Sequence, residues 1–247
     1  MFFRYRTEAF SFKKEDTGEF DELFSFYTKD FGKIEVLARG IKKMKSKLRG
    51  SVDLFTLSKI EFVQGKTFKT LTDALLIERF NSIKKNLFKL KLVFAISDFL
   101  DSLLIAQEKD EKIWNLIIET LFLIENSKNE LSLLRIYYYY FFWNLVSFLG
   151  YKPELYFCFF CQKRIRPNKI YFIPSEGSLV CQSCAKKGEN LIKVEPETIK
   201  ILRILLEKEP TFLKKLKIKN QYFKGLDKIT KEFFSSLVKK EKSDILK

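Results

Sequence analysis

The sequence predicts an α+β multidomain protein: an N-terminal five-stranded β-barrel, followed by an all-α helical domain with an inserted four-cysteine module. Two observations lead to this prediction. The period of the apolar residues changes from two to about 3.6 near residue 75, which separates strands from helices. Cysteines occur only as two Cys-x-x-Cys pairs, both within the helical part. The predicted boundaries are 1–78 for the barrel, 79–155 and 189–247 for the helical domain, and 156–188 for the cysteine module.

The first 78 residues have the alternation of short antiparallel strands. In "KIEVLA", residues 33–38, apolar and charged residues alternate, and the turn "KDFG" joins this segment to "LFSFYT" as a hairpin. In "FTLSKIEFV", residues 55–63, the apolar phase changes near Ser58, which predicts a bulge. A first strand at residues 6–12 and a last one after Gly65 complete five strands. Five strands in about 70 residues predict a small barrel such as an OB-fold.

The rest of the chain is predicted to be mainly helical. Apolar residues recur at spacings of three and four in two runs: Leu92, Ile96, Phe99 and Leu103, then Ile113, Ile117, Leu121 and Ile124. Residues 131–149 are apolar on nearly every face, so we expect a buried helix at the centre of a bundle. Pro196 suits the first position of a further helix. A last amphipathic helix carries Phe223, Leu226, Ile229, Phe233 and Leu237.

The net charge favours an anionic partner. Lys and Arg number 46 against 31 Asp and Glu, which gives a formal charge of +15 at pH 7. Such an excess favours nucleic acid, a membrane surface or an acidic peptide, and charge alone does not choose among them. The apolar run of residues 136–150 is too short to span a bilayer, which takes roughly 20 apolar residues.

The N-terminus predicts a protein that stays in the cytoplasm. Arg4, Arg6 and Glu8 interrupt its apolar residues, so it lacks the apolar region of a signal peptide. Thiols remain reduced in the cytoplasm, where paired Cys-x-x-Cys motifs indicate metal binding more often than disulfides.

The four cysteines predict a metal site. Cys158, Cys161, Cys181 and Cys184 have the spacing C-x2-C-x19-C-x2-C, and the segment between the pairs can form a hairpin that turns at Gly177. Four thiolates complete the tetrahedron of one zinc ion and leave no open position, which is typical of a structural site. The same ligands can hold a single iron atom as a redox centre, and a metal-free cluster of reduced cysteines is the third interpretation.

A second segment predicts nucleic-acid binding. Residues 38–50, "ARGIKKMKSKLRG", follow a predicted strand and contain six cations and no acid: Arg39, Lys42, Lys43, Lys45, Lys47 and Arg49. A cationic loop beside an open barrel can neutralise DNA phosphates without reading bases. The alternative interpretation is a solvated loop that keeps the protein soluble.

Aromatic residues of the predicted strands have two interpretations. Phe24, Phe26, Tyr27 and Phe55 can stack on nucleobases, as OB-fold aromatics do, or fill the barrel core. Catalytic patterns are missing from the sequence. The chain contains no histidine, which excludes a Ser-His-Asp or Cys-His arrangement, and no phosphate-binding glycine loop. We therefore expect a protein that is not an enzyme.

The order of these motifs resembles the RecO family of bacterial recombination mediators. "YTKDFGKIEVLARGIKKMKSKLRG" resembles the N-terminal signature of that family, and the matching residues are Thr28, Gly32, Ala38, Gly40, Lys42, Lys43, Lys45, Ser46 and Gly50. "LGYKPELYFCFFC" and "FIPSEGSLVCQSC" resemble its zinc module, with Leu149, Gly150, Pro153, Leu155 and the four cysteines as the matching residues. The resemblance covers roughly residues 6–185. Lys42, Lys43 and Lys47 stand where arginine is common in the family, and Ser178 stands where a second glycine is usual.

The resemblance implies a non-catalytic DNA-binding protein with an N-terminal OB-fold and a helical domain that a zinc module interrupts. Similar proteins bind single- and double-stranded DNA and anneal complementary strands. Together with RecR they load RecA onto DNA covered by single-strand DNA-binding protein, whose acidic C-terminal tail docks on the helical domain in some members. Two other hypotheses stay open here: an RNA-binding or ribosome-associated module built from the same parts, and a redox protein with a four-cysteine iron centre.

Overall fold

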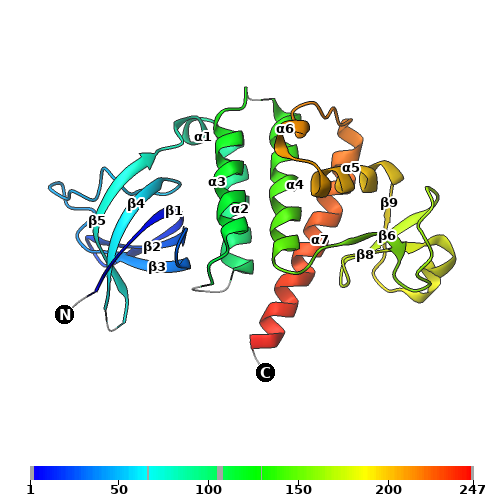
Figure 1. Cartoon of the computed structure of the whole chain (residues 1–247), viewed down its shortest axis with the longest axis horizontal. Coiled ribbons are helices and arrows are strands. Elements are labelled where there is room, and N and C mark those ends of the chain that lie inside the picture. Colours follow the sequence, from blue (N-terminus) through cyan, green and yellow to red (C-terminus); the bar gives the residue numbers. More distant parts are fainter. Residues whose placement is uncertain (1–2, 66, 105–107, 129, 246–247) are drawn as a thin grey trace. The chain divides into compact units, whose positions relative to one another are not determined.

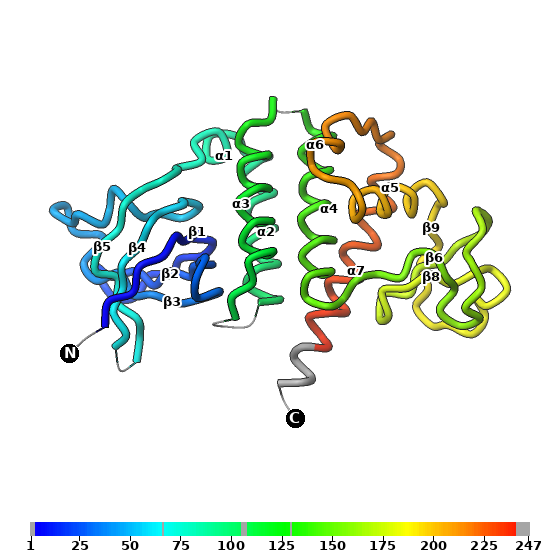
Figure 2. The backbone as a smooth tube through the Cα atoms, viewed as in Figure 1, coloured from blue at the N-terminus to red at the C-terminus, as the bar shows by residue number. Residues whose placement is uncertain are grey.

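The computed structural model describes residues 3–65, 67–104, 108–128 and 130–245, with side chains as far as Lys240. The chain divides into two compact units, Met1–Asn126 and Ser127–Lys247. The first unit contains a β-barrel and the helices α1–α3, and the second contains the helices α4–α7 and a small sheet (Figures 1 and 2).

The barrel is closed and has the strand order β1-β2-β3-β5-β4. Its strands are β1 (Arg4–Thr17), β2 (Asp21–Thr28), β3 (Gly32–Ala38), β4 (Leu57–Gln64) and β5 (Lys69–Glu78). Only the closing pair of β3 and β5 is parallel, and the other pairs are antiparallel. This five-stranded barrel confirms the OB-fold that the alternation of the first 78 residues predicts.

The predicted β2–β3 hairpin turns at Gly32. The Thr28 hydroxyl donates to the Gly32 carbonyl at 2.9 Å and accepts from the Phe31 N–H at 3.0 Å. Gly32 has a φ of +62°, and a Cβ on this residue would lie 2.1 Å from the backbone oxygen of Glu108. Only glycine fits this turn, because it tolerates positive φ and lacks the Cβ that would collide with Glu108.

A β-bulge lies beside Ser58, where the sequence predicts one, but the extra residue belongs to β5 and not to β4. The β4–β5 register shifts between Leu57 and Ser58, where Ile77 of β5 has no partner in β4. The pairing of β4 with β1 continues without a shift. Phe55, whose side chain suggested a change of phase within the strand, precedes β4 and has a φ of 57°. β4 itself therefore contains no bulge, and its buried apolar residues lie on both faces, Leu57 on one and Ile60 and Phe62 on the other.

Three helices complete the first unit: α1 (Asn81–Lys85), α2 (Leu87–Leu103) and α3 (Glu111–Glu125). The side chain of Asn86 caps α2, and that of Asp110 caps α3. The barrel packs against α2, where the Phe55 and Phe94 rings meet with centroids 4.8 Å apart. Lys13 of β1 and Lys33 of β3 both reach a carboxylate oxygen of Asp101 at 3.0 Å. The barrel and these helices therefore belong to one packed unit.

The helix α4 (Leu131–Phe148) is central to the second unit, as its apolar sequence predicts. The ring of Trp143 stacks on Phe233 of α7 (Asn220–Ile245) at a centroid distance of 5.2 Å, and its indole N–H donates to Thr230 at 3.1 Å. The predicted helix beginning at Pro196 is α5 (Pro196–Glu207), and α6 (Pro210–Leu213) follows it. No helix within the described ranges is long and apolar enough to cross a membrane.

The cysteine region forms a four-stranded sheet in the order β6-β8-β7-β9. Its strands are β6 (Glu154–Cys158), β7 (Ile170–Ile173), β8 (Ser178–Cys181) and β9 (Ile192–Val194), and the 3-10 helix η1 (Gln182–Lys187) follows β8. The predicted hairpin is β7–β8, and it turns at Gly177 with a φ of +59°. A Cβ on Gly177 would lie 3.0 Å from the Phe233 ring, so the hairpin approaches α7 closely.

Candidate metal centre and cationic loop

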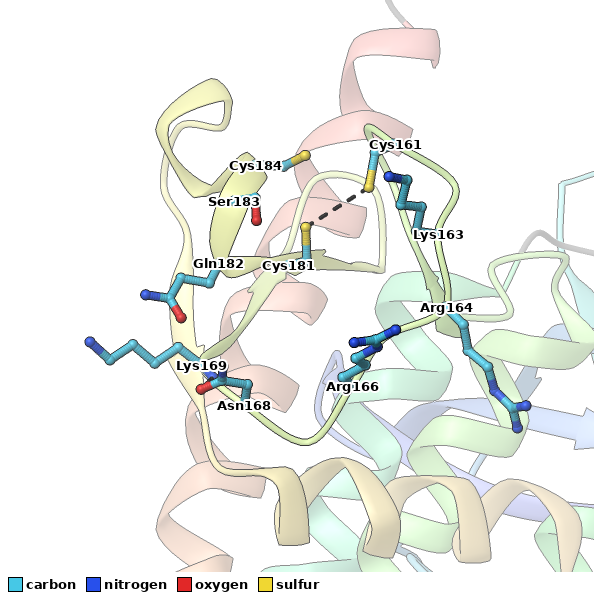
Figure 3. A pocket seen from close by; sticks show the side chains of 10 residues that line it. All are labelled: Cys161, Lys163, Arg164, Arg166, Asn168, Lys169, Cys181, Gln182, Ser183 and Cys184. Atoms are coloured by element: carbon cyan, nitrogen blue, oxygen red, sulfur yellow. Dashed lines mark hydrogen bonds between the residues drawn. The ribbon is translucent and has the colours of Figure 1, made fainter.

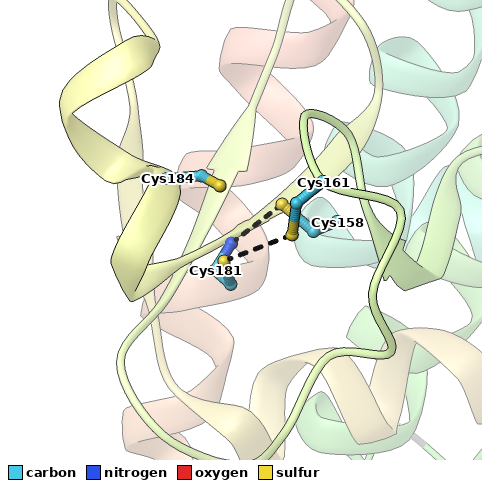
Figure 4. Close-up of side chains that lie close together, drawn as sticks. All are labelled: Cys158, Cys161, Cys181 and Cys184. Atoms are coloured by element: carbon cyan, nitrogen blue, oxygen red, sulfur yellow. Dashed lines mark hydrogen bonds between the residues drawn. The ribbon is translucent and has the colours of Figure 1, made fainter.

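The four cysteines lie together at one end of the small sheet (Figure 4). Their four sulfur atoms all lie within 4.8 Å of one another, and Cys161 Sγ is 3.9 Å from Cys181 Sγ. Zinc binds thiolate at about 2.3 Å, so a regular tetrahedron places its sulfurs about 3.8 Å apart. The spacing of the four sulfurs therefore fits one tetrahedral ion.

Local backbone geometry aims each pair of sulfurs. Cys158 ends β6, and its carbonyl accepts from the Gln162 N–H at 2.9 Å in a turn that brings Cys161 back toward it. Gln162 has a φ of 56°. Cys181 ends β8, and Cys184 lies on η1 directly after it. The parallel pairing of β6 with β8 brings the two turns together.

The polar surroundings of the sulfurs differ. Burial raises the pKa of Cys158, but the backbone N–H groups of Cys181, Cys161 and Phe160 outweigh it and lower that pKa to about 6. Burial and the neighbouring thiols raise the pKa of Cys184 to about 12. Four thiolates this close repel one another, so together they require a cation between them. The cluster is thus suited to a divalent metal.

The site lies in a small apolar cluster. Cys158 and Cys184 are buried and pack with Ile173 and Val180, while Cys161 and Cys181 are half-buried. A metal ion with four thiolate ligands has no position left for water or substrate. This donor set therefore supports a structural role and gives no site for chemistry at the metal.

The cationic loop connects β3 to β4. Arg39, Lys43, Lys45, Lys47 and Arg49 are exposed, whereas Lys42 is half-buried. Lys42 Nζ lies 2.7 Å from a carboxylate oxygen of Asp16. The structure thus leaves five of the six predicted cations open to solvent and places the sixth in an ion pair.

The loop is fixed to the barrel at both ends. The Gly40 N–H donates to the Asp21 carboxylate at 2.6 Å, and the Lys42 N–H donates to the Phe20 carbonyl at 3.1 Å. Ile41 and Val52 are buried in the barrel core. These anchors hold the backbone of the loop while five of its six cations are exposed to solvent.

Phe20 is a candidate contact that the sequence patterns did not identify. The residue is 41% exposed, and its ring lies under Lys43, whose Nζ is 5.3 Å from the ring centroid. The turn between β1 and β2 contains Phe20, so no strand alternation marks it. The one feature of the sequence that could have identified Phe20 is its place beside a glycine turn, in "TGEF" before the second strand.

The aromatic residues of the strands fill the core. Phe24, Phe26, Tyr27 and Phe55 are all at most 1% exposed. Phe24 and Phe26 stack on each other inside the barrel with centroids 5.6 Å apart. Base stacking on these four rings is excluded in this structure, so the core interpretation is confirmed.

Comparisons with known proteins agree on one family. The family model for the Recombination protein O N terminal matches residues 1–80, and that for the Recombination protein O C terminal matches residues 84–244. The chain is 26% identical over 242 residues to a protein of Dehalococcoides mccartyi named DNA repair protein RecO, covering 98% of this chain and 94% of that one. It is 27% identical to the DNA repair protein RecO of Desulforamulus reducens, covering 96% and 91% of the two chains. A third relative of the same name, from Caldanaerobacter subterraneus, is 27% identical and is covered over 90% of its length.

Proposed function

The chain belongs to the RecO family of DNA repair proteins, and from this premise we propose that it is a non-catalytic recombination mediator that binds DNA through its cationic loop. It binds single- and double-stranded DNA and anneals complementary strands. With RecR it helps load RecA onto DNA that single-strand DNA-binding protein covers. The basic chain suits the acidic C-terminal tail of that protein, but no described residue is assigned to the tail or to RecR.

The observation that supports this proposal is the exposure of the loop cations on an OB-fold barrel. Arg39, Lys43, Lys45, Lys47 and Arg49 extend from a backbone that the barrel core anchors. Cations at fixed positions neutralise phosphates and release counterions, which gives binding without base specificity. Lys42 belongs to the same proposed surface and contributes less, because Asp16 already neutralises part of its charge.

We propose that the four cysteines hold one structural zinc ion. Cys158, Cys161, Cys181 and Cys184 are its ligands, and the ion fastens the ends of β6 and β8 together. Zinc supplies folding free energy here, on the order of 10 kcal/mol as in isolated zinc-finger peptides. Elemental analysis of the purified protein tests this: one zinc per chain is expected, and one iron per chain with a visible colour would contradict it.

Salt dependence of single-stranded DNA binding tests the loop. The triple variant K43A/K45A/K47A should flatten the slope of log K against log salt by about 2 units, because each lost phosphate contact removes about 0.7 for a single strand. The matched control K224A/K228A/K231A removes the same charge from exposed positions of α7. Equal slopes for the two variants would show that the loop is not part of the DNA-binding site.

Strand annealing tests the function itself. The purified chain should accelerate pairing of complementary DNA strands, with and without single-strand DNA-binding protein, and the loop variant should be slower. Competition between single-stranded DNA and RNA separates this function from that of an RNA-binding module. A chain that prefers RNA and does not anneal DNA would contradict the proposal.

A further inference from the structure

The cysteine module has a cationic hollow of its own. A cavity of about 720 Å³ opens beside three of the cysteines, and Lys163, Arg164, Arg166 and Lys169 line it (Figure 3). All four side chains are exposed. None of them forms an ion pair with an acidic residue among the side chains that the structure describes. Their charges are therefore available to an anionic ligand.

The positive charge of the module exceeds what a zinc site needs. One zinc ion with four thiolates carries a net charge of −2. Residues 156–188 contain six cations and a single acid, Glu176. Glu176 lies in the β7–β8 turn and does not line the hollow. Neutralising the metal site thus accounts for only part of this charge.

The cations continue beyond the first hollow. Arg166 also lines a second cavity of about 400 Å³, to which Lys200 and Arg203 of α5 contribute. One acid, Glu197, lines that cavity too. The two hollows share Arg166, and cations distributed over two adjacent hollows suit a chain of phosphates better than one isolated anion.

Exposed aromatic rings accompany these cations. Phe157 is 44% exposed and Phe159 is 38% exposed. Phe157 and Arg164 are directly paired in an isolated antiparallel bridge, so their side chains lie on the same face. Proteins that bind single-stranded nucleic acid combine cations that contact the phosphate backbone with aromatic rings on which bases stack. Duplex DNA hides the faces of its bases, so the exposed ring favours a single strand.

We propose that the cysteine module is a second contact for single-stranded nucleic acid. Lys163, Arg164, Arg166 and Lys169 hold backbone phosphates, and Phe157 stacks on a base. This inference rests on the proposed function and deepens it, because one chain then holds nucleic acid at the barrel loop and at the module. The metal site thereby fixes the position of binding residues as well as fastening two strands.

Matched charge variants of the full-length zinc protein test the phosphate contact. K163A/K169A should flatten the salt slope for a single-stranded DNA oligonucleotide by about 1.4 units, from two contacts of about 0.7 each. K186A/K187A removes the same charge from exposed positions of the same module that line neither hollow, and it should leave the slope unchanged. Both variants should retain one zinc per chain, which checks that the module is folded. Equal slopes for the two variants would overturn the proposal.

Substitutions of Phe157 test the stacking contact. Phe157→Ala should weaken binding of the oligonucleotide about tenfold, whereas Phe157→Tyr, which keeps an aromatic face, should bind within about twofold of the original chain. Equal losses for both variants would contradict stacking. Zinc content again serves as the folding control.

The outcomes separate this inference from the proposed function. If K43A/K45A/K47A flattens the slope and K163A/K169A does not, the loop function stands and the module contact fails. If the unaltered chain does not bind the oligonucleotide, both fail. Poly-glutamate serves as a probe for an acidic protein partner: loss of its binding in K163A/K169A, with DNA binding unchanged, would assign the hollow to a peptide and overturn the proposal.

Discussion

The barrel loop and the cysteine module both present exposed cations, but different forces hold them in place. The loop is fixed by Ile41 and Val52, which are buried in a closed barrel with a large apolar core. The module has only a small apolar cluster around Cys158 and Cys184, and in our proposal a zinc ion on its four sulfurs holds it together. Under the proposed function, a surface of one chemical type thus rests on packing in one region and on a bound metal ion in the other. The two regions should respond differently to metal removal and to changes in the barrel.

The largest expected effect is on the module. Cys158→Ser removes one of the four proposed zinc ligands, so the module should lose most of a stabilisation on the order of 10 kcal/mol. We expect zinc loss, protease cleavage within residues 156–188 and lower soluble yield, with the barrel amides still protected from hydrogen exchange. Ser183→Ala, at an exposed position between two ligands, is the control and should keep its zinc. Loss of hydrogen-exchange protection in the barrel would show that the barrel, like the module, depends on the cysteine site.

A glycine substitution tests how far the barrel depends on its turns. Gly32→Ala places a Cβ 2.1 Å from the Glu108 backbone oxygen at a φ of +62° and should cost about 3 kcal/mol in free energy of unfolding. Gly18→Ala has a similar φ of +74° with nothing within 4 Å, and should cost only about 1 kcal/mol. Chemical denaturation of the zinc-loaded chain measures both. Equal costs would show that the approach of Glu108 is unimportant.

The ion pairs between barrel and α2 should have a smaller effect. Burial alone would raise the pKa of Asp101, but hydrogen bonds from Lys13 and Lys33 outweigh it and lower that pKa. A lowered folded pKa gives stability that is present above the unfolded value of about 3.9 and lost as pH falls through the folded value. Asp101→Asn should therefore cost at most about 1 kcal/mol near pH 7, because the pair is partly exposed, and less at acid pH. Asp98→Asn, exposed on the same helix, is the control; the pH dependence of unfolding separates them.

The smallest effect distinguishes two lysines of the loop. Lys42 is paired with Asp16, whereas Lys45 is exposed. Lys45→Ala should lower the salt slope of single-stranded DNA binding by about 0.7, and Lys42→Ala by less, because Lys42 must leave Asp16 to meet a phosphate. A larger change for Lys42 would indicate that DNA displaces Asp16.

The division into domains at residues 78, 155 and 188 remains a proposal. The contacts of α2 with the barrel place residues 79–126 in the first compact unit. A fragment of residues 1–126 should therefore be more stable than one of residues 1–78, in which Phe55 would lose its contact with Phe94. Thermal unfolding of the two fragments measures the difference.

The sequence by itself determined most of the elements and the cysteine cluster. Alternation over residues 33–38 predicted β3, the spacing of apolar residues predicted α2 and α3, and Pro196 marked the start of α5. The two Cys-x-x-Cys pairs predicted the sulfur cluster. These features were readable because each depends on residues that are close along the chain, where the period of a helix or strand, or the reach of a turn, fixes which side chains meet.

Only the tertiary structure decided which side chains remain exposed. The strand aromatics Phe24 and Phe26 became core when the barrel closed, and Lys42 of the β3–β4 loop met Asp16 of β1. The cations of the module were visible in "KRIRPNK", but the hollow that Arg166 shares with Arg203 depends on how the module packs on α5. Burial and ion pairing between residues that are distant in the sequence depend on how the whole chain folds. The local period of a helix or strand does not specify which distant side chains will be in contact.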